Sequence, residues 1–154
     1  MRVPLIITLL WVLFLKGHAC ECPEYEIRIL DSISYANSDL VLIGTIEKIG
    51  NEYKIKVIEL FKGEAKDLIL IGLTGGEDEV FSTCTFYPRR TGEYILYLNR
   101  KIINGRTIYY ASECLGSRLL NSDYFPVSLK QKESKEIIIQ KTNEWISYLR
   151  IQNK

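Results

Sequence analysis

The chain has 154 residues, of which 47% are hydrophobic and 25% charged, and this composition is typical of one folded domain. Its 20 basic and 19 acidic residues give a formal net charge of +1, which argues against a nucleic-acid binder because such proteins concentrate basic charge. The single histidine, His18, lies in a segment that we expect to be removed. Without it the chain cannot build a histidine-dependent catalytic group or metal site, so we predict that the protein is not an enzyme and needs no cofactor.

Residues 1–19 have the pattern of a secretory signal peptide. Arg2 gives a positive start, residues 3–15 form an apolar run, and Gly17 and Ala19 place small residues where a signal peptidase reads the chain. The apolar run is shorter than the roughly 20 residues that span a bilayer, which argues against a membrane anchor. A retained amphipathic or membrane helix is the alternative. The pattern therefore predicts cleavage after Ala19.

Cleavage there leaves an exported domain over residues 20–154. The loss of Arg2 and Lys16 lowers the number of basic residues from 20 to 18, against 19 acidic ones. A cysteine directly after the cut also occurs in bacterial lipoproteins, but the residues before Cys20 fit that signal poorly. We predict a secreted, extracellular protein without a stable membrane span, and a periplasmic or lipid-anchored protein is the alternative.

Four cysteines lie in the exported domain, namely Cys20, Cys22, Cys84 and Cys114. Export places them in an oxidising compartment, where such cysteines usually form disulfides. A bridge between Cys20 and Cys22 would be strained, so each is expected to pair with one of the two distant cysteines, in either arrangement. A zinc site made of all four is the alternative, although this spacing is weak for zinc.

The first element predicted in the exported domain is a helix over residues 24–37. Its apolar positions follow helical spacing at Ile29, Ile33 and Ala36, and two further apolar residues, Ile27 and Leu30, widen the stripe.

Short strands follow. Glycine or Asn-Gly turns separate segments rich in β-branched and aromatic residues, at residues 39–49, 53–62, 67–73, 93–100 and 106–111, and a further segment, 80–87, contains Cys84. Gly44 lies inside the first strand, where it indicates a bend or bulge. The turns are Gly50-Asn51 and Asn104-Gly105. Five or six short strands with short connections predict a small antiparallel barrel or sandwich.

The tail has a different pattern. Residues 130–149 carry Ile137, Ile138, Trp145 and Leu149 with lysine and glutamate between them. This spacing predicts an amphipathic helix that packs back on the barrel. Nothing in the sequence indicates a linker or a repeat, so residues 20–154 are expected to form one domain.

Several short motifs occur in a characteristic order. Cys-x-Cys stands at the predicted new N-terminus, and NSDLV, Gly-Thr, Phe-Lys-Gly and two lone cysteines follow, at residues 37–41, 44–45, 61–63, 84 and 114. In this order the motifs resemble the tissue inhibitors of metalloproteinases, which are netrin-like OB-fold barrels. The resemblance covers roughly residues 20–120. It implies a mainly β, OB-fold-like, five-stranded antiparallel barrel with an N-terminal helix, to which the predicted C-terminal amphipathic helix is added.

The resemblance also implies a pairing of the cysteines and a function. The implied bridges are Cys20–Cys84 and Cys22–Cys114. In the family, the N-terminal cysteine chelates the catalytic zinc of a metalloproteinase through its α-amine and carbonyl, and the next side chain enters the specificity pocket of the enzyme. The contact residues expected here are Cys20, Glu21, Cys22, Pro23, Ser82, Thr83 and Cys84, with Cys20 as the ligand of the target's zinc.

The sequence departs from the family at several positions. Ala36 stands where the family has the first cysteine of a third bridge, no cysteine follows Cys114, and the second, disulfide-rich domain is absent. Glu21 occupies the pocket-entering position, where the family has Ser or Thr. Because an unpaired carboxylate is costly to bury in an apolar pocket, a secreted netrin-like binding module without inhibitory activity is the alternative function.

Overall fold

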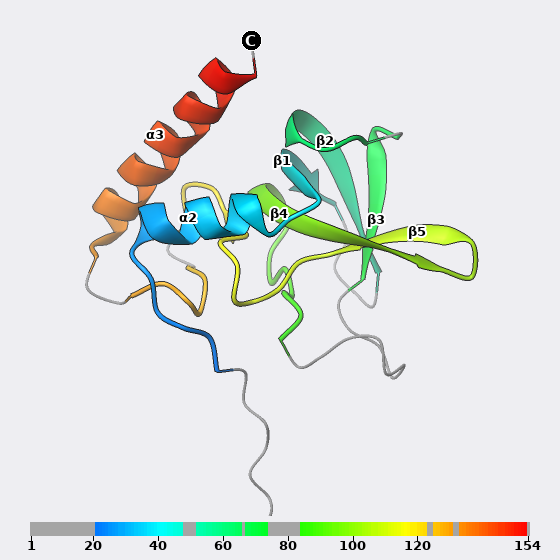
Figure 1. The fold of residues 1–154 in the computed structure, drawn as a ribbon, viewed down its shortest axis with the longest axis horizontal. Coiled ribbons are helices and arrows are strands. Elements are labelled where there is room, and N and C mark those ends of the chain that lie inside the picture. The colour runs from blue at the N-terminus through cyan, green and yellow to red at the C-terminus, as the bar shows by residue number, and fades with distance from the viewer. Residues whose placement is uncertain are drawn as a thin grey trace, which may run out of the picture.

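The computed structural model describes residues 21–47, 52–65, 67–73, 84–122, 125–130 and 133–153. The predicted signal peptide, Cys20, the turn at Gly50-Asn51, Ser82 and Thr83 lie outside these residues. The described elements, in chain order, are α2 (Ile27–Ala36), β1 (Leu40–Ile46), β2 (Glu52–Lys62), β3 (Ile69–Leu73), β4 (Gly92–Ile103), β5 (Arg106–Tyr110), β6 (Arg118–Leu119) and α3 (Lys135–Gln152). In Figure 1 the two helices lie on one side of the strands, and the β4–β5 hairpin projects on the other.

Five strands close into a barrel. Their order is β1-β2-β3-β5-β4, and the additional pairing of β1 with β4 completes the circle. Every neighbouring pair is antiparallel except β3 and β5, which run parallel and are in register at Gly72 and Tyr109. The short strand β6 pairs with β4 outside the circle. The structure therefore confirms the predicted OB-fold-like barrel with a helix at each end of the domain.

Local sequence signals in the strands correspond to observed features. The register of β1 against β2 shifts between Ile43 and Gly44, as the bulge prediction requires. Asn104 and Gly105 have positive φ values of 50° and 77°, the pair of left-handed residues that a tight hairpin turn needs. Of the segment 80–87, only residues 84–87 are described, and they make a single bridge, at Thr85, rather than a strand.

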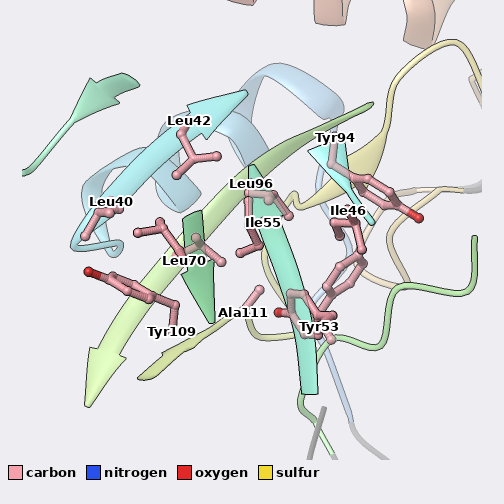
Figure 2. Packing of buried hydrophobic residues seen from close by; sticks show 12 residues of the cluster. Leu40, Leu42, Ile46, Tyr53, Ile55, Leu70, Tyr94, Leu96, Tyr109 and Ala111 are labelled. Atoms are coloured by element: carbon pink, nitrogen blue, oxygen red, sulfur yellow. The ribbon is translucent and has the colours of Figure 1, made fainter. Parts of the chain in front are cut away.

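The barrel interior is filled by side chains that alternate along the strands (Figure 2). Strand β1 is buried on both faces, because one face lines the interior and the other supports a helix. The interior residues are Leu40, Leu42, Ile46, Tyr53, Ile55, Leu70, Phe86, Tyr94, Leu96, Leu98, Tyr109 and Ala111.

Helix α3 covers the outer face of the barrel, as the tail prediction states. Ile146 and Leu149 pack against a barrel face made of Val41, Ile43, Phe61, Ile95 and Tyr97. The helix begins after Ser134, whose hydroxyl accepts a hydrogen bond from the amide of Ile137. The side chain of Ile137 is exposed, so the prediction that it belongs to the packed stripe is wrong.

Helix α2 forms where it was predicted, but its buried face matches the predicted stripe only in part, since Ile27 and Leu30 are buried as expected and Ala36 is exposed. The buried positions are Ile27, Leu30, Asp31 and Ser34, whereas Ile29 is 50% exposed. These buried residues have i, i+3, i+4, i+7 spacing, and the predicted stripe also had helical spacing. The rest of the predicted stripe is wrong because two polar residues, Asp31 and Ser34, take the remaining buried positions, where they have hydrogen-bond partners inside the protein.

A buried polar network joins both helices to the barrel. The guanidinium of Arg118 donates to both carboxylate oxygens of Asp31 on α2, at 2.6 and 2.9 Å, and also to the hydroxyl of Thr142 on α3. The hydroxyl of Tyr97 on β4 donates to the same carboxylate at 2.7 Å. Each of these four residues is less than a tenth exposed. The network holds α2, and with it the chain that precedes α2, in one position on the barrel.

Candidate functional site

The N-terminal segment, residues 21–26, is fixed to the domain at two points. Cys22 forms a disulfide with Cys114, 92 residues later, with 5.1 Å between the two Cα atoms. Three residues further on, the Tyr25 amide donates to the Ser128 carbonyl at 2.8 Å, and the Lys130 amide donates to the Tyr25 carbonyl at 2.9 Å. This short parallel bridge and the disulfide leave little freedom to the residues around them.

Two side chains project from this fixed segment. Glu21 and Pro23 are exposed, and Cys22 between them is half-buried. An extended backbone places alternate side chains on opposite sides, so the disulfide turns inward while its two neighbours face solvent. The segment therefore presents Glu21 and Pro23 on a rigid base.

A second predicted contact segment lies against the same part of the chain. The Glu113 amide donates to the Cys84 carbonyl at 2.7 Å, and the Phe86 amide donates to the Ala111 carbonyl at 2.8 Å. Between these two hydrogen bonds, Thr85 pairs with Ser112. Residues 111–113 thus form main-chain hydrogen bonds with the Cys84 segment. The next residue, Cys114, is joined to the N-terminal segment by its disulfide.

The structure therefore brings together two segments that lie about sixty residues apart in the sequence. One consists of Glu21, Cys22 and Pro23, and the other begins at Cys84. We refer to residues 21–23 and 84–85 as the ridge. Of the other predicted contact residues, Cys20, Ser82 and Thr83 lie outside the described residues.

The disulfides decide between alternatives that the sequence left open. The Cys22–Cys114 bridge is the one implied by the family resemblance, and Cys84 is also disulfide-bonded. No described cysteine is free. A zinc site that uses all four cysteines is therefore wrong, because the sulfur atoms of Cys22 and Cys114 are bonded to each other. The expected partner of Cys84, Cys20, is outside the described residues.

Three carboxylates lie in the ridge or beside it in the sequence and in the segment that supports it. Glu21 and Glu24 are exposed on the N-terminal segment, and Glu113 is half-buried on the segment that supports it. A partner that covers the ridge must pair these carboxylates or leave them in water, because burying an unpaired carboxylate is costly. The charge therefore favours a partner with basic groups around its binding cleft.

Within the described residues, no three His, Cys, Asp or Glu side chains are grouped closely enough to hold a metal ion. No described helix is both long enough and apolar enough to cross a membrane. No protein family model, curated protein or solved structure matches the chain.

The second anchor of the N-terminal segment was not predicted from the sequence. The bridge between Tyr25 and Leu129 joins residues more than a hundred positions apart, and it uses only main-chain atoms. Main-chain pairing of this kind leaves no local signature, unlike a cysteine. The buried Asp31 was also missed, although a carboxylate beside Ile27 and Leu30 on one helical face is a recognisable signal.

Proposed function

We propose that the protein is a secreted inhibitor of zinc metalloproteinases that docks through the ridge. The supporting observation is that segment 111–114 joins Glu21, Cys22 and Pro23 to Cys84 and Thr85 on an OB-fold-like barrel. For these residues the arrangement agrees with what the resemblance to the tissue inhibitors of metalloproteinases implies, and this agreement supports the proposal. A rigid, exposed N-terminal edge next to a second loop can enter the cleft of a protease.

The inhibitory chemistry of the proposal needs no catalytic side chain. After signal cleavage the first residue is Cys20, whose free α-amine has an ordinary pKa of about 7.7 and is partly neutral at physiological pH. A neutral amine and the adjacent carbonyl oxygen can chelate a zinc ion. They would then occupy the position of the water molecule that a hydrolytic zinc enzyme activates.

Rigidity of the segment supports tight binding. The disulfide at Cys22 and the backbone bridge at Tyr25 already hold the chain on either side of Pro23. A preorganised segment loses less conformational entropy when it docks, so more of the contact energy appears as affinity.

Glu21 sets the specificity in this proposal. Its carboxylate enters the pocket that the family fills with Ser or Thr, and burying it without a partner costs several kcal/mol, where about 1.4 kcal/mol is a factor of ten in affinity. A protease with a basic residue in this pocket would pair with the carboxylate. We therefore infer that the target has a basic specificity pocket.

The test uses protein whose first residue is Cys20, titrated against a panel of zinc metalloproteinases with apolar and with basic pockets. We expect inhibition of enzymes with basic pockets, and we expect Glu21→Thr to weaken it while improving inhibition of enzymes with apolar pockets. Glu47→Thr, at another exposed glutamate, is the matched control and should leave the inhibition of both groups of enzymes unchanged. If neither the native protein nor Glu21→Thr inhibits any enzyme of the panel, the domain is a binding module without inhibitory activity.

A further inference from the structure

Among the described pairings of the closed barrel, the one between the parallel strands β3 and β5 is the shortest. Among the described residues these two strands are in register only at Gly72 and Tyr109. On the side of the strand starts, a cavity of about 570 Å³ lies between β3, the connection before it and the β4–β5 hairpin. We call this cavity the barrel mouth. The hairpin that forms one wall projects away from the helices (Figure 1).

The barrel mouth combines an apolar floor with a charged rim. Leu70 and Tyr109, both part of the barrel core, form the floor. The rim is divided by charge, with Glu64 and Asp67 on the β2–β3 connection and Arg100 and Arg106 on the hairpin. All four charged side chains are exposed, and none of them makes an ion pair with another described residue.

Apolar side chains extend this surface outward. Leu68 is 78% exposed, Ile69 51% and Ile102 74%, and they lie at the start of β3 and on the hairpin. Barrel mouths are common ligand sites, and exposed apolar groups beside charged ones are typical of surfaces that bind proteins.

The edge of β3 adds main-chain groups to the same wall. The Leu68 carbonyl faces β2, where it accepts from the Val57 amide at 2.9 Å. Successive residues of a strand turn their N–H and C=O groups to opposite sides, so the groups of Ile69 point away from β2. Ile69 also lines the cavity. A donor and an acceptor at strand spacing are the groups that an added peptide strand uses.

We propose that the barrel mouth binds an extended peptide segment of a partner protein. In the bound peptide, an apolar side chain rests on Leu70 and Tyr109, a basic side chain faces Glu64 and Asp67, and an acidic side chain faces the two arginines. The paired signs on the rim and the main-chain groups of β3 favour a peptide over a nucleic acid, which the two carboxylates would repel. This surface is separate from the ridge, so the proposal does not depend on inhibition.

The test begins with a phage library of random peptides of about ten residues, selected on the disulfide-intact protein. Selected peptides are synthesised with a fluorescent label, and their affinity is measured by polarisation. We expect an apolar residue flanked by one basic and one acidic residue. The double variant Arg100→Glu, Arg106→Glu should weaken binding about tenfold or more, because it replaces attraction by repulsion.

A charge exchange completes the test. When the acidic residue of the peptide is replaced by lysine, the double variant should recover affinity while the native protein loses it. Lys135→Glu, an exposed reversal on α3, is the matched control and should bind like the native protein. The proposal is overturned if no selected peptide depends on the rim charges. It is also overturned if sedimentation shows that the protein self-associates through them, since the occupant would then be a second copy.

Discussion

At the scale of single residues, the ion pair between Asp31 and Arg118 is the most consequential feature of the domain. It is nearly inaccessible to solvent, with its side chains 1% and 2% exposed. Burial disfavours the charged guanidinium, but the neighbouring carboxylate outweighs this effect and raises the pKa of Arg118 above its ordinary value. Removing either partner leaves the other charge buried without a counter-ion, which costs more than the pair contributes when it is intact.

We therefore expect Asp31→Asn to lower the free energy of unfolding by about 3–5 kcal/mol, measured by urea denaturation with the disulfides intact. The double variant Asp31→Leu, Arg118→Met removes both charges and should recover much of this loss. Arg28→Ala breaks the solvent-exposed pair of Arg28 with Glu144 and serves as the control, with an unchanged midpoint. If the double variant loses as much free energy of unfolding as Asp31→Asn, the network contributes through packing and not through charge.

Tyr53 is the second residue with a distinctive environment. Its side chain is inaccessible to solvent and points into the barrel (Figure 2), and its hydroxyl has no hydrogen-bond partner among the described residues. Burial raises the pKa of Tyr53 well above its ordinary value. In the unfolded chain this tyrosine loses its proton near pH 10, whereas the folded protein keeps it. The protonated Tyr53 therefore makes its full contribution to the free energy of unfolding below about pH 10, and this contribution is lost as the pH rises above that value.

Tyr53→Phe is expected to stabilise the protein by about 1 kcal/mol at pH 7, because it removes a polar group that is buried without a partner. The variant should also lose less stability than the native protein between pH 9 and about 11. Some alkaline loss remains, since burial and the adjacent Asp31 also raise the pKa of Tyr97. Urea titrations at pH 7, at pH 9 and at about pH 11 measure the two effects. A variant that is less stable than the native protein at pH 7 would show that the hydroxyl has a partner.

At the scale of elements, the sequence predicted which segments are helices and strands better than it predicted their faces. Periodicity located α2 and α3, but the face of α2 depends on Arg118, which lies far away in the sequence and neutralises Asp31. The exposed position of Ile137 was also missed, although nine residues separate it from the buried Ile146 and helical geometry places the two on opposite faces of α3.

Strand pairing could likewise be predicted only where the sequence contains a local signal. Turn residues predicted the β4–β5 hairpin, since Asn104 and Gly105 specify it locally. The parallel contact of β3 with β5 has no local signal, because it joins segments separated by β4. For the candidate site, the cysteines predicted which parts of the chain would meet, but the backbone hydrogen bonds of Tyr25 and Cys84 came only from the structure.

A matched pair of isoleucines on α3 tests how this helix is held. Ile146 is 4% exposed and packs on the barrel, whereas Ile151 is 69% exposed. Ile146→Ala is expected to lower the free energy of unfolding by about 2–5 kcal/mol, because it removes buried groups and leaves a cavity. Ile151→Ala should have almost no effect. Equal urea midpoints for the two variants would contradict the packing of α3 on the barrel.

At the scale of the whole molecule, a closed barrel carries two separate exposed surfaces. The ridge is fixed by the Cys22–Cys114 disulfide, which closes a loop of 92 residues and stabilises the domain by about 4–5 kcal/mol if chain entropy alone is counted. The barrel mouth lies at the β4–β5 hairpin, and none of the residues that line it is a cysteine. In the account proposed above, the fold serves to hold the N-terminal segment rigid.

The most direct test of this account is the inhibition constant of protein that begins at Cys20, compared with protein extended by one alanine before Cys20. The target is a zinc metalloproteinase that the native protein inhibits. The extension converts the α-amine of Cys20 into an amide, which binds zinc poorly, and adds bulk at the point of contact. We predict that inhibition falls by about a thousandfold or more, equivalent to about 4 kcal/mol, while thermal stability stays the same. An unchanged inhibition constant would show that the amine is not the zinc ligand and would contradict the account.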